Sequence, residues 1–262
     1  MSAREAPNSV SFHLRLILLS VRRSRRVLRR LTEHAMQVFC DFDGTISKED
    51  VTDLVLQRYA RPEWRAIEDQ WVSGKITSAI CMQRQIRLIE ATRAELNAFL
   101  DTVEIDSDFI AFKRFCDNAG LGLSVVSDGV DYFIRRVLRR HQIASIPVIA
   151  NRLREGDELS KSAYDLDFPA ISSGCNAGSG VCKCAVVSPS VDYIYIGDGR
   201  SDFCVSNEAP VVFAKSNLAD YCRSRGIEFF PYDSFADVQR SLASILSIPS
   251  RRRPALPVKK SA

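Results

Sequence analysis

Two aspartates, Asp41 and Asp43, follow the short apolar run 36–40 and stand two positions apart. Alternate side chains of an extended chain share one face, so both carboxylates can project into the same crevice. Close carboxylates repel one another unless a divalent cation neutralises them or one of them holds a proton. The pair therefore indicates a hard-cation site or a carboxyl group that keeps its proton.

Further polar residues follow other apolar runs or precede expected helices, where parallel strands would bring them together at their carboxyl ends. They are Ser127, Asp128 and Gly129 after the run 121–126, Lys183 after the glycine-rich segment 173–180, and Asp198 and Asp202 after the run 193–196. Taken alone, each is an ordinary turn or surface sequence. Their joint order along the chain favours one shared site.

The chemistry of this set suits phosphoryl transfer. Several carboxylates can form a Mg²⁺ site, because this ion prefers oxygen ligands, and Lys183 adds positive charge for an anionic substrate. The Ser127 hydroxyl and the main-chain N–H groups near Asp128 and Gly129 supply hydrogen-bond donors. One carboxylate can attack phosphorus while a second protonates the leaving oxygen.

The elements that position these residues alternate between short apolar runs and helical patterns. This alternation predicts an α/β fold with a doubly wound parallel sheet. Apolar residues at near-helical spacing from 49 to about 103 predict a bundle of about four short helices, inserted after the first strand. Residues 146–168 predict extended, hairpin-like segments around Gly156.

Charge is distributed unevenly along the 262 residues. Residues 1–35 carry +6 and residues 249–262 carry +5, so the formal total of +4 leaves −7 for 36–248. We expect 1–35 to be a basic extension that is disordered or not native, and 249–262 to be a disordered basic tail. Between them we expect a folded core over 36–48 and 105–248 and a helical cap over 49–104.

Composition argues against several classes of protein. Hydrophobic residues at 46% and charged residues at 26% are ordinary globular values. The absence of an apolar stretch near the ~20 residues that cross a bilayer, and of a convincing signal peptide, leads us to expect a soluble, cytoplasmic protein. Cys175, Cys182 and Cys184 are close together but lack the paired CxxC or His ligands of a typical zinc site, so their role stays open.

The four motifs together resemble those of the haloacid dehalogenase superfamily of aspartyl phosphatases. Residues 41–45 match the Asp-x-Asp-Gly-Thr motif, Ser127 matches the second motif, Lys183 the third, and residues 197–202 the fourth. The resemblance covers about 36–245 and implies the core and cap expected above. A first motif with two aspartates implies phosphatase rather than dehalogenase chemistry.

The resemblance also implies a role for each motif residue. Asp41 would be the nucleophile that forms an aspartyl-phosphate, and Asp43 the general acid and then the general base. Ser127 and Lys183 would hold the phosphoryl group. The Mg²⁺ ligands would be Asp41, the main-chain carbonyl of Asp43, and Asp198, with Asp202 either a further ligand or a residue beside the ligands.

Details of the insert and motifs resemble the phosphoserine phosphatase-like subgroup. Segments 68–76, 127–133, 180–183 and 197–204 look like those of the 2-hydroxy-3-keto-5-methylthiopentenyl-1-phosphate phosphatases of methionine salvage. Phosphoserine phosphatases usually carry Ser-Gly-Gly at the second motif, where this chain has Asp128. Segment 197–204 is also similar to that of phosphocholine and phosphoethanolamine phosphatases, so these substrates and phosphoserine stay as alternatives.

We therefore expect a Mg²⁺-dependent phosphomonoesterase of a small phosphorylated metabolite, acting as a monomer or homodimer without nucleic acid and without a membrane span. Candidate cap contacts to the substrate are Trp71, Lys75, Arg84 and Gln85, although ordinary cap-helix roles explain them equally well. Transfer of the phosphoryl group to an acceptor other than water would keep the same intermediate. The alternative from another class is a non-catalytic binding protein that uses its basic termini.

Overall fold

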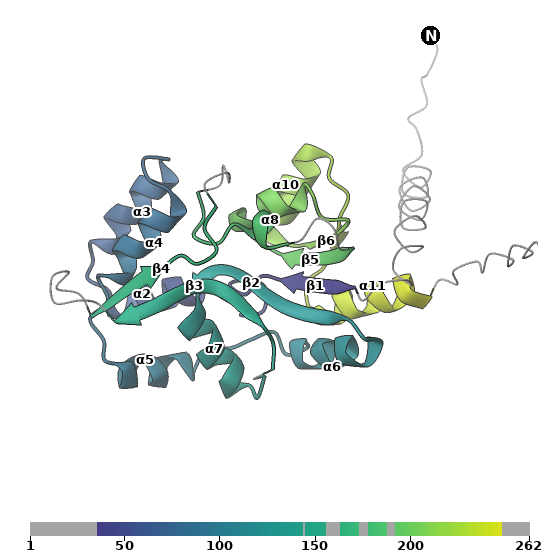
Figure 1. The fold of residues 1–262 in the computed structure, drawn as a ribbon, viewed down its shortest axis with the longest axis horizontal. Helices are drawn as coiled ribbons and strands as arrows, with labels where there is room; N and C mark the ends of the chain where they lie inside the picture. The colour runs from purple at the N-terminus through teal and green to yellow at the C-terminus, as the bar shows by residue number, and fades with distance from the viewer. Residues whose placement is uncertain (1–35, 144, 156–162, 173–177, 188–191, 248–262) are drawn as a thin grey trace, which may run out of the picture.

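A sheet of seven strands runs through the part of the chain that the computed structural model describes, residues 36–143, 145–155, 163–172, 178–187 and 192–247 (Figure 1). Its strands are β1 (Gln37–Cys40), β2 (Gly122–Val130), β3 (Val148–Glu155), β4 (Tyr164–Asp167), β5 (Tyr193–Gly197), β6 (Val211–Ala214) and β7 (Phe230–Pro231). Their order is β4-β3-β2-β1-β5-β6-β7. Neighbours pair in parallel except for the antiparallel pair β3–β4, which confirms the expected hairpin.

The central strands are buried because helices cover both faces of the sheet. All five residues of β5 are buried, which is typical of a parallel strand between two helical layers. β1 lies between β2 and β5, and its last residue, Cys40, pairs with Val125 on one side and Ile196 on the other. The chain after Cys40 therefore emerges at the middle of the carboxyl edge of the sheet.

Helices that connect the strands form the two layers. On one face lie α6 (Phe109–Ala119) and α7 (Asp131–Arg140), and on the other α8 (Lys183–Val186) and α10 (Ser216–Arg225) (Figure 1). The short helix α9 (Phe203–Ser206) packs between α8 and α10, and α11 (Phe235–Ser247) packs beside α6. The ring of Phe235 lies 4.8 Å from that of Phe109 and joins α11 to the main core. The α/β fold predicted from the sequence is confirmed.

Four helices lie between β1 and α6: α2 (Val51–Tyr59), α3 (Trp64–Val72), α4 (Ser78–Ile86) and α5 (Arg93–Leu100). They do not form the single bundle that we expected. Helices α3 and α4 pack against each other, while α5 lies against α7 under the sheet (Figure 1). An ion pair between Arg136 and Asp101, and the stacking of Arg93 over the Tyr132 ring at 4.3 Å, hold α5 there. We call the pair α3–α4 the cap.

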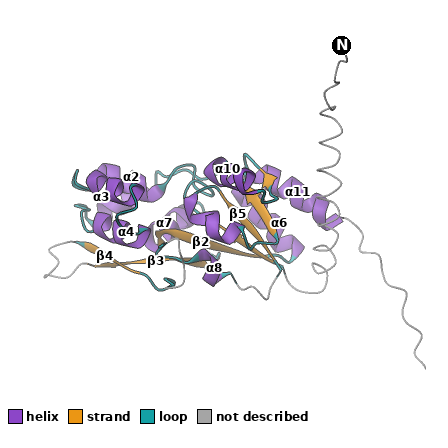
Figure 2. Ribbon diagram, turned by 90° about the horizontal axis from the view of Figure 1, so that it is seen from above, coloured by secondary structure: helices purple, strands orange, loops and turns teal. Residues whose placement is uncertain are grey.

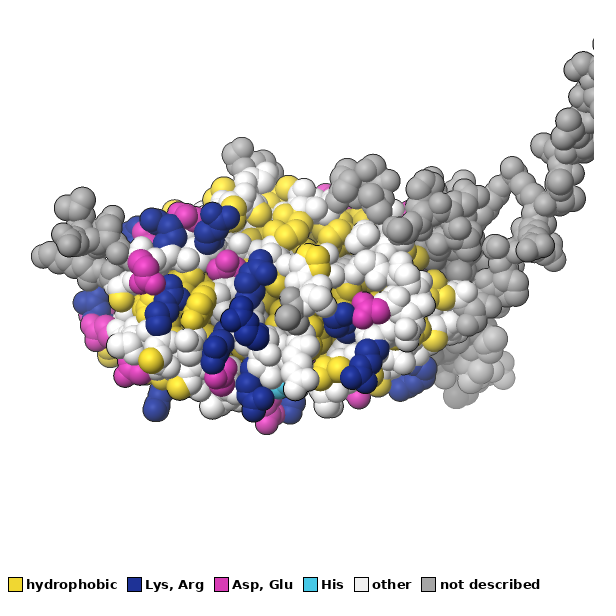
Figure 3. All heavy atoms as spheres, turned by 60° about the horizontal axis from the view of Figure 1, so that its bottom comes forward, with side chains coloured by type: hydrophobic (Ala, Val, Ile, Leu, Met, Phe, Trp, Pro, Cys, Tyr) yellow, Lys and Arg dark blue, Asp and Glu magenta, His cyan; other side chains and the backbone are white. Residues whose placement is uncertain are grey.

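The cap lies at one end of the molecule and helices α6, α10 and α11 lie toward the other, as Figure 2 shows from above. The face that carries α5, α6 and α7 has Lys and Arg side chains mixed with acidic ones (Figure 3). Among the described helices, none combines the length and apolar character needed to cross a membrane. The expected basic ends, 1–35 and 249–262, lie outside the described residues, as does Cys175.

Candidate active site

The acidic motif residues meet at the carboxyl edge of the sheet. Asp41 directly follows β1, and its N–H still donates to the carbonyl of Ile196 on β5, at 2.9 Å. Asp198 directly follows β5, and Asp202 ends a 3₁₀ turn (Arg200–Asp202) after it. Carboxylate oxygens of Asp41, Asp198 and Asp202 all lie within 4.8 Å of one another. The convergence predicted from strand ends is thus observed.

Lys183 lies at the centre of this group as the first residue of α8. Its Nζ lies 2.7 Å from Asp41 Oδ2 and 2.5 Å from Asp202 Oδ1, and it donates to Ser201 Oγ at 2.9 Å. Lys183 and Asp202 are fully buried. Burial alone would lower the pKa of Lys183, but Asp202 and Asp41 outweigh it and raise that pKa. The lysine therefore stays cationic beside the acidic group.

Asp202 has both carboxylate oxygens engaged. Oδ1 accepts from Lys183 and from the Tyr195 hydroxyl, and Oδ2 accepts from the main-chain N–H groups of Asp198 and Gly199, each at 3.0 Å. Such a residue orients Lys183 and the turn that carries Asp198. Tyr195 was not among the predicted site residues. Its signal was present, since a tyrosine in a fully buried strand needs a partner for its hydroxyl.

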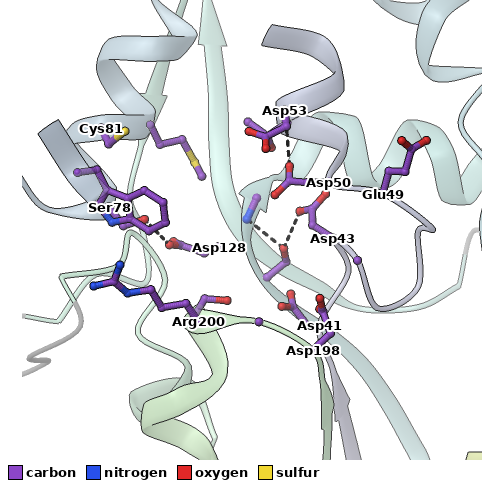
Figure 4. Close-up of a pocket in the computed structure, with 18 of the residues that line it drawn as sticks. Asp41, Asp43, Glu49, Asp50, Asp53, Ser78, Cys81, Asp128, Asp198 and Arg200 are labelled. Atoms are coloured by element: carbon purple, nitrogen blue, oxygen red, sulfur yellow. Dashed lines mark hydrogen bonds between the residues drawn. The ribbon is translucent and has the colours of Figure 1, made fainter. Parts of the chain in front are cut away.

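Asp43 lies between Asp41 and the start of α2 (Figure 4), where its Oδ1 accepts from the Val51 N–H at 2.9 Å. Its Oδ2 accepts from Ser127 Oγ at 3.3 Å, and Ser127 Oγ accepts from the Gly129 N–H at 2.9 Å. Burial, followed by the negative charges of Asp50 and Asp41, raises the pKa of Asp43 well above its usual value. A carboxyl group in this state keeps its proton and can donate it.

Close contacts with aspartate side chains explain why positions 44 and 129 are glycines. Gly44 has a φ of +68°, and a Cβ there would lie 2.5 Å from Asp198 Oδ2. A Cβ at Gly129 would lie 2.3 Å from Asp43 Oδ2. Thr45, for which we had predicted no role, donates from Oγ1 to Asp198 Oδ1 at 2.7 Å. The loop after β1 thus wraps closely around Asp198.

A cavity of about 420 Å³ opens between these strand ends and the cap (Figure 4). Its acidic lining residues are Asp41, Asp43, Glu49, Asp50, Asp53, Glu68, Asp128 and Asp198. Its basic lining residues are Lys48 and Arg200, with Lys183 buried behind Asp41. The negative lining makes a bound cation favourable.

The predicted cap contacts divide into two groups. Trp71 and Gln85 line the cavity, whereas Lys75 and Arg84 are absent from its lining. Gln85 is buried and donates to Glu68 Oε2 at 2.7 Å. The guanidinium of Arg200 lies 5.3 Å from the centre of the Trp71 ring, so this tryptophan joins the cap to the core.

The Asp128 side chain and the cysteines have partners or surroundings that the sequence did not reveal. We expected phosphate donors from the main chain near Asp128; its carboxylate accepts from Ser78 of the cap and from the main-chain N–H of Val181. Cys182 is buried and Cys184 half-buried. Among the described residues, the group suited to a metal is Asp41, Asp198 and Asp202 rather than a set with cysteines.

The donor set fits Mg²⁺. Asp41 and Asp198 present carboxylate oxygens from neighbouring strand ends, and a hard cation prefers such ligands. Burial is the first cause that raises the pKa of both carboxyl groups, and each also faces further negative charge from Asp202. A bound cation would relieve this unfavourable charge.

The model of the haloacid dehalogenase-like hydrolase family matches residues 38–206, and the chain belongs to this family. Two curated relatives are 2-hydroxy-3-keto-5-methylthiopentenyl-1-phosphate phosphatases. The one from Brevibacillus brevis is 28% identical over 215 residues, covering 79% of this chain and 95% of the relative. The one from Exiguobacterium sp. is 28% identical over 214 residues, covering 79% and 97%.

Solved structures show the same fold. A phosphoserine phosphohydrolase-like protein from Francisella tularensis has a TM-score of 0.58 at 17% identity, covering 79% of this chain and 99% of its own. The phospho-aspartyl intermediate analogue of phosphoserine phosphatase has a TM-score of 0.56 at 16% identity, covering 81% and 99%. Together with the family, the relatives confirm the predicted enzyme class, a phosphoric monoester hydrolase.

Proposed function

We propose that this hydrolase cleaves the phosphate monoester of a small metabolite, with Asp41 as nucleophile and with Mg²⁺ as cofactor. The contact between Lys183 and Asp41, 2.7 Å long and buried, carries the proposal. It sets a nucleophilic oxygen beside the positive charge that a phosphoryl group needs in order to approach a carboxylate. An ordinary surface turn or a nucleic-acid-binding surface has no need of a buried lysine in contact with a buried aspartate.

The proposed reaction has two steps on Asp41. A carboxylate oxygen of Asp41 bonds to phosphorus, the bond from phosphorus to the leaving oxygen breaks, and Asp43 gives its proton to that oxygen. Asp43 then takes a proton from water, whose oxygen bonds to phosphorus as the bond to Asp41 breaks. Free phosphate and the original carboxylate result. The raised pKa of Asp43 supports the first of its two roles.

Other residues of the site bind and orient. Lys183 and Ser127 would hold the phosphoryl oxygens, together with the main-chain N–H of Gly129. Asp202 would hold Lys183 in place, since its two oxygens accept hydrogen bonds from four groups. Mg²⁺, held by Asp41, Asp198 and the main-chain carbonyl of Asp43, would supply positive charge that offsets that of the phosphoryl group.

For the substrate we propose the enol phosphate of methionine salvage. The names of the curated relatives support this choice, because the alignments cover nearly their whole length. A cavity of about 420 Å³ suits a small metabolite. Phosphoserine is the second candidate, favoured by the fold of the solved structures, but Asp128 occupies the place of a motif glycine.

We also propose a cytoplasmic enzyme that works as a monomer or homodimer, without nucleic acid. Six of the described cysteines support a reducing compartment because they form no disulfide: Cys40, Cys81, Cys116, Cys184, Cys204 and Cys222. The curated relatives are named as phosphatases of a small phosphorylated metabolite, which also supports a location in the cytoplasm.

The test is phosphate release from a panel of phosphorylated metabolites, with and without Mg²⁺. The panel includes the methionine-salvage enol phosphate, phosphoserine, phosphocholine, phosphoethanolamine and p-nitrophenyl phosphate. Borohydride added during turnover should reduce the acyl phosphate and convert Asp41 to homoserine, which mass spectrometry detects. Absence of Mg²⁺-dependent phosphate release from every member would overturn the proposed reaction. A clear preference for phosphoserine would overturn the proposed substrate.

A further inference from the structure

Asp128 joins two segments that are far apart in the sequence. Its Oδ2 accepts from Ser78 Oγ at 2.9 Å, and its Oδ1 accepts from the Val181 N–H at 2.9 Å (Figure 4 shows the first contact). The residue is 9% exposed. Hydrogen bonds to a buried carboxylate are stronger than those between neutral groups. Both oxygens of Asp128 therefore already have partners in the protein.

The contact with Val181 acts on the entry to α8. Val181 lies two residues before Lys183, and the intervening Cys182 N–H donates to the carbonyl of Ala170 at 2.9 Å. Helix α8 has four residues, too few to be stable by itself, so contacts of the preceding chain must fix its position. Holding residues 178–182 thus holds Lys183 against Asp41.

The contact with Ser78 acts on the cap. Ser78 is the first residue of α4, and the next N–H, that of Ala79, donates to the carbonyl of Gly178 at 3.1 Å. The start of α4 also lies tightly on this segment, since a Cβ at Gly178 would be 2.9 Å from the Cβ of Thr77. The positive end of the α4 dipole favours the nearby carboxylate of Asp128.

A third partner fixes the Asp128 backbone. Asn151 on β3 is fully buried, and its Nδ2 donates to the Asp128 carbonyl at 2.5 Å. Gly180 packs directly against Asn151, because a Cβ there would lie 2.4 Å from Asn151 Oδ1. Asp128 therefore lies where four parts of the protein meet: the end of β2, the neighbouring strand β3, the cap and the segment 178–182.

We propose that Asp128 is a positioning residue that couples docking of the cap to the placement of Lys183. A docked cap completes the contacts of Ser78 and Ala79 with Asp128 and Gly178, and these contacts fix the segment that leads into α8. The inference rests on the proposed function through the role of Lys183. It assigns a role to the Asp128 side chain, whereas the sequence suggested phosphate donors from the main chain near Asp128 and Gly129.

The test compares Asp128→Asn, Ser78→Ala and the double variant with wild type. The matched control is Asp117→Asn, which changes a carboxylate on α6 whose partner is Lys113. Steady-state kinetics use p-nitrophenyl phosphate with Mg²⁺. Amide hydrogen exchange is measured without substrate on peptides that cover 78–86 and 178–187.

We expect Asp128→Asn to lower kcat by roughly 10- to 100-fold, because Lys183 is displaced slightly from its working position, while KM changes much less. Exchange should become faster in both peptides. Ser78→Ala should lower kcat less, yet still accelerate exchange at 178–187, and the double variant should be no worse than Asp128→Asn. Asp117→Asn should match wild type in every measurement.

Two results would overturn the coupling. One is a raised KM with unchanged kcat and unchanged exchange at 178–187 in Asp128→Asn, which indicates direct substrate binding. The other is a Ser78→Ala protein whose exchange changes at 78–86 alone. Because exchange needs no turnover, it tests the coupling even if wild type releases no phosphate. Ser78→Ala removes a single hydroxyl and keeps the test decisive if Asp128→Asn does not fold.

Discussion

The sheet edge and the cap hold their charged side chains in different ways. At the sheet edge, Asp41, Lys183 and Asp202 are buried and linked by contacts of 2.5 to 2.7 Å. On the cap, Lys75 and Arg84 are exposed. Buried charges keep their geometry because each would be costly without its partner, whereas exposed charges contribute little. The proposed reacting groups thus lie at the buried sheet edge, and the exposed charges of the cap are the part that can differ with the substrate.

The largest effect that separates these regions should come from Asp41→Asn. An amide oxygen is a poor nucleophile, so we expect activity to fall by at least ~10³-fold. The measurement is phosphate release with Mg²⁺, with folding checked by circular dichroism. Asp117→Asn, the same chemical change on an exposed carboxylate of α6, should keep full activity. Residual activity within tenfold of wild type would show that another residue attacks phosphorus.

The next largest effect should come from Asp43→Asn and should depend on the leaving group. General acid catalysis contributes roughly 10²- to 10⁴-fold. We expect a loss of this order with alkyl phosphates and a much smaller loss with p-nitrophenyl phosphate, whose leaving group needs less help from a proton. An equal loss with both substrates would contradict a role in protonating the leaving oxygen.

The pH dependence gives a second view of the same residue. Burial and the charges of Asp50 and Asp41 raise the pKa of Asp43. Asp43 therefore keeps its proton at pH values where an ordinary aspartate has lost it, and releases it only at still higher pH. We expect kcat for alkyl phosphates to fall on the alkaline side, and Asp43→Asn to abolish that fall. A fall that persists in the variant would assign it to another group.

Sequence reasoning succeeded at the sheet edge for a physical reason. Asp41 and Asp198 each follow an apolar run, and parallel strands must end side by side, so their meeting follows from the pattern. Contacts between packed segments are different. The hydrogen bond from Ser78 to Asp128, and the one from Tyr195 to Asp202, depend on how a helix or a strand face is oriented in three dimensions. No local pattern encodes that orientation.

The insert illustrates the same limit. Its helical spacing was visible, and four helices are found between β1 and α6 in the described chain. The pattern does not indicate which of these helices pack together, because amphipathic helices of similar length show the same spacing of apolar residues. The Arg136–Asp101 pair and the stacking of Arg93 on Tyr132 decide that α5 joins α7. Lys75 and Arg84 were candidates on helical spacing alone, and they do not line the cavity.

A smaller effect should appear when Mg²⁺ is removed. Burial raises the pKa of Asp41 and Asp198, so folded protein without metal binds more protons than unfolded protein, and its stability falls as pH rises above 3.8. Bound Mg²⁺ removes that cost. Saturating Mg²⁺ should therefore raise Tm by roughly 5 °C at about pH 8, and by less at about pH 5. Asp198→Asn should weaken the response, and an equal shift at both pH values would contradict the assignment.

The smallest effects should separate the two kinds of cap residue. Trp71 lines the cavity and stacks on Arg200, so Trp71→Ala should raise KM for the physiological substrate by about 10-fold, equivalent to ~1.4 kcal/mol of lost contact. Arg200→Ala should produce a similar change, and the double variant should lose less than the sum because one contact is shared. Lys75→Ala and Arg84→Ala, from the same two helices and their connection, should stay within about twofold of wild type. If Lys75→Ala and Arg84→Ala raised KM as much as Trp71→Ala, the cap would contact the substrate outside the cavity. The exposed charges of the cap would then matter for binding, and the contrast with the buried charges of the sheet edge would fail.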